Sequence, residues 1–392
     1  MAWQLDEIRW QRARAAMDEA DIDALVVRAP DNVHYLTNYW SMKAWEIAIF
    51  PREGKPVVVA VEPQESDVRR NAWTDDIAFF KGFNPDDPRP SYLRALEQAI
   101  AILRERGLTR RVGVETSNAV QAPERMTGEP TVYWKGYFDD LEAAIDDVVD
   151  CTPMLTRLRM IKTDQEIERM RITNDLAAEA VQHVRQHIRA GMKDAEVGSM
   201  YEAYVHSHGI GYRGSVEMAR AFTLVWSGES IQTFTATKDK VVQDDAPTLM
   251  EIWTVTDGYW NDLTKNACPG VLTSEYNVLV DLLLGVFDEA VRDHVGPGAS
   301  LAELDGFVRA RIAEGGYAGQ PSHYICHGVG SRAHEPPWAH PMSDQIMEPG
   351  MVLAVEPGIY WEGGGGLRLE DNFLITGTGA EKLCSAPEEF RP

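Results

Sequence analysis

The stretch His327–Asp371 reads HGVGSRAHEPPW at 327–338, MEPGMVLAVEPGIYW at 347–361 and GLRLED at 366–371. It places His327 and His334 seven residues apart and two acidic residues, Glu356 and Glu370, in runs typical of β-strands. Upstream, the stretch EIWTVTDGYWNDLTKN at 251–266 places Glu251 and Asp262 eleven residues apart. Imidazole and carboxylate groups are ligands that divalent metals accept. We interpret these stretches as two halves of one carboxylate–histidine site.

Strand alternation sharpens this interpretation, because side chains at i and i+2 share one face of a strand. In LAVE the residues Ala354 and Glu356 share a face opposite Leu353 and Val355. The same rule puts Arg368 with Glu370 in LRLE, Glu251 with Trp253 in MEIW, and Asp262 with Thr264 in DLT. A carboxylate inside a packed sheet is costly unless it is paired or binds a metal. The pattern therefore favours a site for up to two divalent ions, a geometry typical of hydrolases.

Bulk composition limits the class of protein. The 392 residues allow two or three domains, and 44% of them are hydrophobic, which suffices for a large core. The formal net charge of −23 argues against binding to nucleic acid or to an anionic membrane, since both need basic patches. The four cysteines are widely spaced and the N-terminus has no apolar signal core, so a reducing cytoplasm is the expected location.

The N-terminal part predicts a small α/β domain at 1–155. The predicted elements are a helix at 4–20, a strand at Ala24–Val27, a hairpin of Ile47–Phe50 with Pro56–Val61, a helix at Leu93–Arg106, a strand at Arg111–Glu115 and a helix at Leu141–Val149. Residues Pro153–Lys162 are interpreted as a connector.

The remainder, 156–392, predicts an α+β domain with a mostly antiparallel sheet. Thr163 and Glu166 form the capping-box pattern T-x-x-E at the start of a long amphipathic helix, with Gly191 as its expected C′ residue. Further helices are predicted at Ala195–His206, Glu275–His294 and Leu301–Glu314, and strands at Phe222–Trp226, Leu249–Val255, Tyr259–Leu263, Met351–Val355 and Leu367–Ile375.

The motifs HGVGSRAHEPP, GMVLAVEPGIY and LRLEDNFLIT resemble the C-terminal motifs of the creatinase, aminopeptidase P and prolidase family (peptidase family M24). LRMIKTDQEIERMR resembles the helix that opens its catalytic domain, and DIDALVVRAPDNVHYLTNY resembles the start of its N-terminal domain. The resemblance covers nearly the whole chain. It implies an α/β N-terminal domain, a C-terminal catalytic domain of the pita-bread fold, and a homodimer.

The resemblance also implies a site with two metals held by two Asp, one His and two Glu. The matching residues are Glu251, Asp262, His327, Glu356 and Glu370, with Mn, Fe, Co or Zn as the candidate ions. Glu356 is further expected to act as general base, and His334 matches a histidine that hydrogen-bonds the substrate or intermediate. His323, a further candidate catalytic residue, fits a histidine of the aminopeptidase P and prolidase branch.

This chain departs from the family pattern at two positions. Glu251 stands where the family has Asp, so a single ion or none is an alternative to two. A family histidine that follows a turn falls near Thr235 in WSGESIQTFTATKD. A hydroxyl can replace one hydrogen bond but not an imidazolium, and loss of such a donor costs about 10²–10³ in rate. An atypical specificity is therefore expected.

Tryptophans follow the motifs closely, and Trp253, Trp260 and Trp338 are candidate substrate contacts. Packing explains them most simply, and the alternative is an aromatic wall for a cationic ligand, at about 0.5–2 kcal/mol per cation–π contact. Arg368 is a further candidate, although pairing with a neighbouring carboxylate is the simpler expectation. Cys326, beside His327, is expected to be a buried structural thiol whose side chain points away from the site.

The sequence therefore predicts a divalent-metal-dependent hydrolase that cleaves an amide-type C–N bond in a small cationic or proline-like substrate. One alternative is an Xaa-Pro dipeptidase or aminopeptidase. Another is a lyase or metal-free hydrolase of a cationic compatible solute, of the creatinase, ectoine hydrolase or dimethylsulfoniopropionate lyase type. The last is a non-catalytic binding protein.

Overall fold

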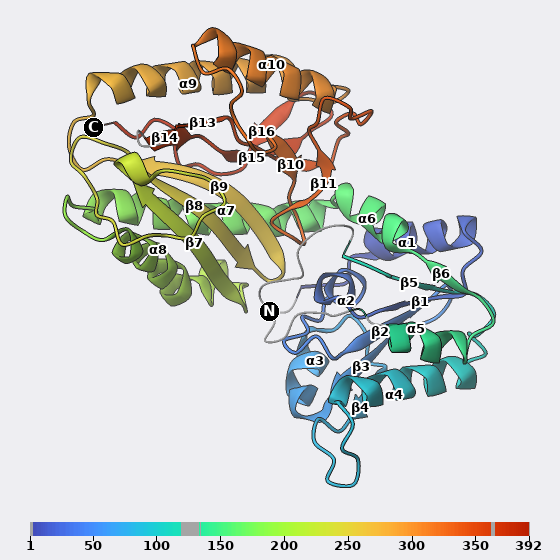
Figure 1. The fold of residues 1–392 in the computed structure, drawn as a ribbon. Coiled ribbons are helices and arrows are strands. Elements are labelled where there is room, and N and C mark those ends of the chain that lie inside the picture. Colours follow the sequence, from blue (N-terminus) through green and yellow to red (C-terminus); the bar gives the residue numbers. More distant parts are fainter. Residues whose placement is uncertain (1–2, 119–132, 134, 362–364, 392) are drawn as a thin grey trace. The chain divides into compact units, whose positions relative to one another are not determined.

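The computed structural model describes residues 3–118, 133, 135–361 and 365–391. The chain divides into two compact units, Met1–Arg159 and Met160–Pro392 (Figure 1). The break falls at the end of a helix, α6 (Thr152–Met160), where the sequence analysis expects a connector and a boundary at 155/156. Among the described residues, no helix is long and apolar enough to cross a membrane.

The N-terminal unit is built on one six-stranded mixed sheet. Its strands, in sheet order, are β4 (Ile77–Phe80), β3 (Val57–Val61), β2 (Ile47–Pro51), β1 (Ala24–Val27), β5 (Val112–Val114) and β6 (Val148–Asp150). Its helices are α1 (Glu7–Glu19), α2 (Pro30–Thr37), α3 (Glu65–Asn71), α4 (Ser91–Glu105), α5 (Lys135–Glu142) and all of α6 except its last residue, Met160. Apolar side chains from alternate strand positions form two clusters, one on each face of the sheet. This arrangement confirms the predicted α/β class.

One predicted element in this unit is wrong. The sequence analysis expects a helix at Leu141–Val149, but helix α5 ends at Glu142 and strand β6 begins at Val148. The segment LEAAIDDVV carries both helix-forming and β-branched residues, so its own pattern is ambiguous. Parallel pairing of β6 with β5 decides the outcome, which local propensity cannot show.

The C-terminal unit opens with two helices that cover one face of a three-stranded antiparallel sheet. The helices are α7 (Asp164–His187) and α8 (Asp194–Gly209), and the strands are β7 (Ala219–Ser227), β8 (Thr248–Thr256) and β9 (Tyr259–Ala267). The capping box of Thr163 and Glu166 is present as predicted. Gly191 is not the C′ residue, because α7 ends at His187 and Ile188 is already extended.

The second half of this unit is a five-stranded sheet with an attached hairpin. The sheet order is β11 (Glu335–Trp338), β10 (Cys326–Gly328), β12 (Val352–Val355), β15 (Asp371–Ile375) and β16 (Ala380–Lys382), and the hairpin is β13 (Gly358–Trp361) with β14 (Gly365–Arg368). Helices α9 (Ser274–His294) and α10 (Leu301–Glu314) lie above this sheet (Figure 1). The predicted single strand Leu367–Ile375 is split at Leu369–Glu370.

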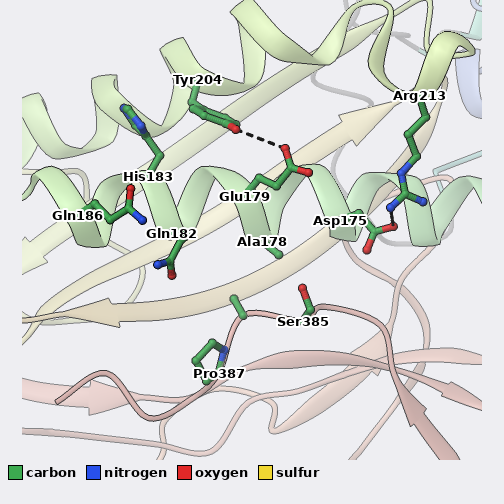
Figure 2. Close-up of a pocket in the computed structure, with 11 residues that line it drawn as sticks. Asp175, Ala178, Glu179, Gln182, His183, Gln186, Tyr204, Arg213, Ser385 and Pro387 are labelled. Atoms are coloured by element: carbon green, nitrogen blue, oxygen red, sulfur yellow. Dashed lines mark hydrogen bonds and ion pairs between the residues drawn. The ribbon is translucent and has the colours of Figure 1, made fainter. Parts of the chain in front are cut away.

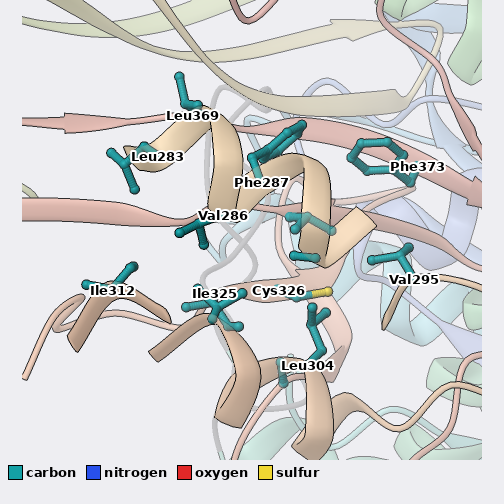
Figure 3. Close-up of a cluster of buried hydrophobic side chains, with 14 of the residues drawn as sticks. Leu283, Val286, Phe287, Val295, Leu304, Ile312, Ile325, Cys326, Leu369 and Phe373 are labelled. Atoms are coloured by element: carbon teal, nitrogen blue, oxygen red, sulfur yellow. The ribbon is translucent and has the colours of Figure 1, made fainter. Parts of the chain in front are cut away.

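Helices α9 and α10 pack against one face of the five-stranded sheet and leave the other face for the site. Leu283, Phe287 and Ile312 from the helices meet Cys326 of β10, Phe373 of β15 and the adjoining residues Ile325 and Leu369 in one buried cluster (Figure 3). Cys326 therefore points into the core, as predicted, and burial raises the pKa of its thiol. Since neighbours along a strand point to opposite faces, His327, which follows Cys326 in β10, is directed to the other side of the sheet.

The N-terminal unit contains a buried carboxyl, Glu115, that completes the start of helix α2. Its Oε1 accepts the backbone N–H groups of Arg28 and Ala29 at 2.6 and 2.8 Å, and Ala29 is the N-cap residue of α2, with no side-chain cap of its own. Burial raises the pKa of Glu115 to about 7, although these hydrogen bonds oppose the shift.

The first prediction follows from this raised pKa. The folded state retains the Glu115 proton at pH values where the unfolded chain has lost it, so the free energy of unfolding falls as pH rises from about 5 to 7, by roughly 1–3 kcal/mol. In Glu115→Gln the amide oxygen can still accept both N–H groups, and this pH-dependent loss should disappear. Denaturant unfolding at pH 5 and pH 8 measures the difference, with exposed Glu105→Gln as control. An unchanged pH dependence in Glu115→Gln would contradict the assignment.

Candidate metal centre

The five predicted metal ligands converge in the C-terminal unit. One carboxylate oxygen each from Glu251, Asp262 and Glu370 lies within 4.8 Å of the other two, and a ring nitrogen of His327 is within the same distance of oxygens of Glu356 and Glu370. His327 Nε2 is 3.4 Å from Glu356 Oε1 and 3.7 Å from Asp262 Oδ2. Motifs that are far apart in the sequence thus contribute side chains to one compact group. These side chains come from the β7–β9 sheet and from the second half of the unit.

Strand position explains why these side chains meet. Glu251 lies mid-strand in β8 and Asp262 in β9, while His327 is the central residue of β10. Glu356 and Glu370 lie where the chain passes between the five-stranded sheet and the β13–β14 hairpin. The Asn372 side chain links the two sheets, since its Nδ2 donates to Asp262 O at 2.7 Å and its Oδ1 accepts from Asp262 N at 3.2 Å.

A glycine allows β10 and β11 to approach closely at the histidine. A Cβ built on Gly328 would lie 2.3 Å from Pro336 O and 2.7 Å from Glu335 O, both backbone atoms that cannot move aside independently. Next to this contact, His327 pairs in register with Trp338. The close approach of the β10 and β11 backbones thus helps to fix the position of His327 in the site.

A metal fits the donors that the structure presents. His327 Nε2 and Glu370 Oε1 are buried, and neither has a hydrogen-bond partner within the described part of the chain. Burial lowers the pKa of His327 and, together with the neighbouring Glu370, raises that of Glu356 well above its usual range. A bound cation would compensate the cost of burying these ligand atoms without hydrogen bonds.

Arg368 occupies the same carboxylate cluster. Its guanidinium forms an ion pair with Glu251, donates from Nε to Thr264 Oγ1 at 2.6 Å, and donates from Nη1 to Tyr360 Oη at 3.2 Å. Pairing with a carboxylate is thus observed, as the simpler expectation had it. Burial lowers the pKa of Arg368.

The histidines differ in their surroundings. His323 is buried, which lowers its pKa to about 4, so the neutral ring donates from Nδ1 to Tyr324 O at 2.6 Å and accepts from Tyr360 Oη at 2.9 Å. His334 lies on the solvent-exposed side of the site, with 40% of its side chain exposed and its Nε2 3.2 Å from Asp262 Oδ2. His334 is therefore the histidine that a ligand entering from solvent can reach.

The other predicted site residues differ in their distance from this group and in their burial. The Trp253 ring is 6.1 Å from that of His334, and the Trp338 ring is 5.4 Å from that of His327. Trp260 is buried, and its backbone N–H donates to Gly330 O. The Oγ1 of Thr235 is buried without a hydrogen-bond partner in the described residues, and the ring of the preceding Phe234 lies perpendicular to that of His323 at 6.4 Å.

Sequence reasoning missed two polar residues of the site. Thr264 Oγ1 donates to Glu370 Oε2 at 2.7 Å while it accepts from Arg368, and Tyr360 connects Arg368 to His323. A signal for Thr264 was present, since it shares a strand face with Asp262. No sequence pattern pointed to Tyr360, because only the fold of the β13–β14 hairpin brings its side chain to Arg368 and His323.

A separate hollow lies on the helix-covered side of the C-terminal unit. It has a volume of about 550 Å³ and lies between α7, α8 and the C-terminal segment, where Glu179, His183, Tyr204 and Pro387 are among its lining residues (Figure 2). Helices α7 and α8 cover the face of the β7–β9 sheet opposite to Glu251 and Asp262. This hollow is therefore not part of the carboxylate site.

Comparison with known proteins identifies the class. The model of "Metallopeptidase family M24" matches residues 168–377, and that of the "Creatinase/Prolidase N-terminal domain" matches residues 9–161. The fold and site thus define a peptidase-like metallohydrolase with a creatinase-type N-terminal domain. The chain belongs to metallopeptidase family M24, whose members generally use divalent metals.

Individual relatives agree with this assignment. An uncharacterised peptidase of Bacillus subtilis is 30% identical over 259 residues, covering 65% of this chain and 71% of that protein. An Xaa-Pro dipeptidase of Pyrococcus furiosus is 26% identical over 375 residues, covering 95% and 97%. The solved Xaa-Pro dipeptidase of Bacillus anthracis superposes with a TM-score of 0.80 at 23% identity, covering 98% and 99%, which confirms the pita-bread fold.

The second prediction concerns Arg368. Replacing it by Gln leaves Glu251 buried without its counter-charge, so the free energy of unfolding of the metal-free protein should fall by about 3–5 kcal/mol. The control is Arg171→Gln, whose partly exposed pair with Glu381 should cost less than about 1 kcal/mol. Denaturant titration checks both variants. Equal losses in the two variants would show that Arg368 does not compensate the carboxylates.

Proposed function

We propose that this protein is a divalent-metal-dependent hydrolase that cleaves the amide bond before proline in a short peptide, as an Xaa-Pro dipeptidase does. The observation that carries the proposal is the convergence of Glu251, Asp262, His327, Glu356 and Glu370, where two buried ligand atoms form no hydrogen bond within the described residues. Relatives named Xaa-Pro dipeptidase that align along 95% of the chain support the choice of substrate.

The residues would divide the work according to their position. When bound, divalent ions supply Lewis acidity for polarising the amide carbonyl and activating water. Glu356, whose pKa burial raises, is suited to accept the proton of the attacking water as general base. His334, exposed on the open side, is placed to donate a hydrogen bond to the substrate oxygen, and His323 is held by Tyr360 at the buried side.

Ion identity, assembly and location complete the proposal. Oxygen-rich donors with one imidazole suit Mn better than softer ions, so we assign manganese, with two ions per chain. Four free cysteines, three of them buried, suit a reducing cytoplasm. A homodimer follows from the family resemblance, and light scattering of the purified protein tests it.

The third prediction tests the metal centre and the reaction together. Protein purified without chelator from Mn-supplemented medium should hold close to two ions per chain by elemental analysis, and should hydrolyse a panel of Xaa-Pro dipeptides. Asp262→Asn should lose metal and lower kcat/KM by at least about 10³-fold, since it removes a ligand from the Lewis-acid site. The control Asp288→Asn changes an exposed carboxyl on α9. Full metal content and activity in Asp262→Asn would reject the proposed centre.

The fourth prediction concerns Thr235, which stands where the family carries a histidine. Its buried hydroxyl, without a described partner, is available to donate to the reacting amide. Thr235→Val keeps the side-chain shape and should lower kcat about 10-fold or more with little change in KM, because one transition-state hydrogen bond is lost. The neighbouring exposed Lys238→Met serves as control. An unaltered kcat in Thr235→Val would exclude the hydroxyl from the reaction.

A further inference from the structure

An aromatic strip runs from solvent to the metal centre across the β7–β9 sheet. Phe222 of β7 pairs in register with Trp253 of β8, and Trp253 pairs with Asp262 of β9. Residues directly opposite one another in antiparallel strands share a face of the sheet. Phe222 and Trp253 are therefore on the face that carries the proposed metal ligands.

The rings form a continuous series. The Phe222 and Trp253 rings stack at 5.4 Å with an interplanar angle of 20°, and Trp253 is 6.1 Å from the ring of His334. Beyond His334, the Trp338 ring lies nearly parallel at 6.5 Å, and Tyr324 lies 5.1 Å from Trp338. His334 thus has two tryptophan rings within 6.5 Å of its own ring.

Along the row of paired residues from Phe222 through Trp253 to Asp262, the exposed fraction decreases toward the metal centre. Phe222 is 44% exposed, Trp253 is 6% exposed and Asp262 is 1% exposed. Tyr324, at the other end of the series, is 46% exposed. The outer rings of the strip therefore offer apolar surface to a group that enters from solvent and ends at the carboxylates.

Local charge indicates which group the strip accepts. Among the described residues, Glu251 pairs with Arg368, and carboxylate oxygens of Glu251, Asp262 and Glu370 lie within 4.8 Å of one another, so these carboxylates serve the proposed metal site at the inner end of the strip. The residue two before Phe222 on the same strand face is a cation, Arg220. A positive neighbour disfavours a cationic side chain and leaves stacking and apolar burial as the available interactions.

We propose that Phe222 and Trp253, with Trp338 on the other ring contact of His334, form a specificity subsite for a neutral aromatic side chain on the residue before proline. The inference rests on the proposed function, since proline then occupies the leaving side and only the preceding residue varies. The enzyme should accordingly prefer Phe-Pro and Tyr-Pro over Ala-Pro and Lys-Pro.

The fifth prediction tests this subsite with Phe222→Ala, Phe222→Leu and, as control, Phe83→Ala, which changes a residue 81% exposed in the N-terminal unit. Phe222→Ala should lower kcat/KM for Phe-Pro about 3–10-fold, mainly through KM, and change that for Ala-Pro less than 2-fold. Phe222→Leu should lie between the wild type and Phe222→Ala, because it keeps apolar volume without the ring.

A binding measurement separates this inference from the proposed function. Isothermal titration of the Mn-loaded protein with phenylacetohydroxamic acid and with acetohydroxamic acid compares an aromatic ligand with a small one of the same head group. Tighter binding of the aromatic ligand that is lost in Phe222→Ala supports the subsite, even if no peptide is hydrolysed. Aromatic binding no tighter than that of acetohydroxamic acid, or equally tight binding in Phe222→Ala, overturns it.

Discussion

The structure of the C-terminal unit depends on the burial of four carboxylates within one packed group. Glu251, Asp262, Glu356 and Glu370 are each less than a tenth exposed, and an isolated buried carboxylate is strongly unfavourable. One guanidinium, Arg368, is placed among them. A single positive charge cannot balance four ionised carboxylates, so burial and the neighbouring Glu370 raise the pKa of Glu356, and a divalent ion is the natural complement.

The polar groups around the carboxylates turn two sheets into one site. Asn372 pairs with the backbone of Asp262, and Thr264 connects Glu370 with Arg368. Tyr360 extends the same network to His323. Because each of these side chains has two partners, displacement of one strand would leave several buried polar atoms unsatisfied, and this cost holds the ligands in register.

The two sides of the centre are chemically different. On the buried side, His323, Tyr360 and Arg368 form a continuous hydrogen-bonded chain away from water. On the solvent-exposed side, His334 is near both Trp253 and Trp338, and the aromatic series continues to exposed Phe222 and Tyr324. A substrate would therefore meet apolar ring surface before it reaches the charged groups, and exclusion of water by those rings would strengthen the electrostatic interactions within.

The sequence alone determined the fold class, most elements and the membership of the carboxylate group, because each of these is encoded locally. Period-2 alternation in MEIW assigns Glu251 to one face of β8, and T-x-x-E marks the start of α7. Glu356 and Glu370, predicted on strands from LAVE and LRLE, lie just outside them. Tertiary structure decided the rest. Strand pairing turned the predicted helix at 141–149 into β6, and the hairpin after Glu356 brought Tyr360 to Arg368. Register in the β7–β9 sheet likewise placed Phe222 beside Trp253. Such contacts join residues far apart in the chain, and no local pattern specifies which strands will lie next to one another.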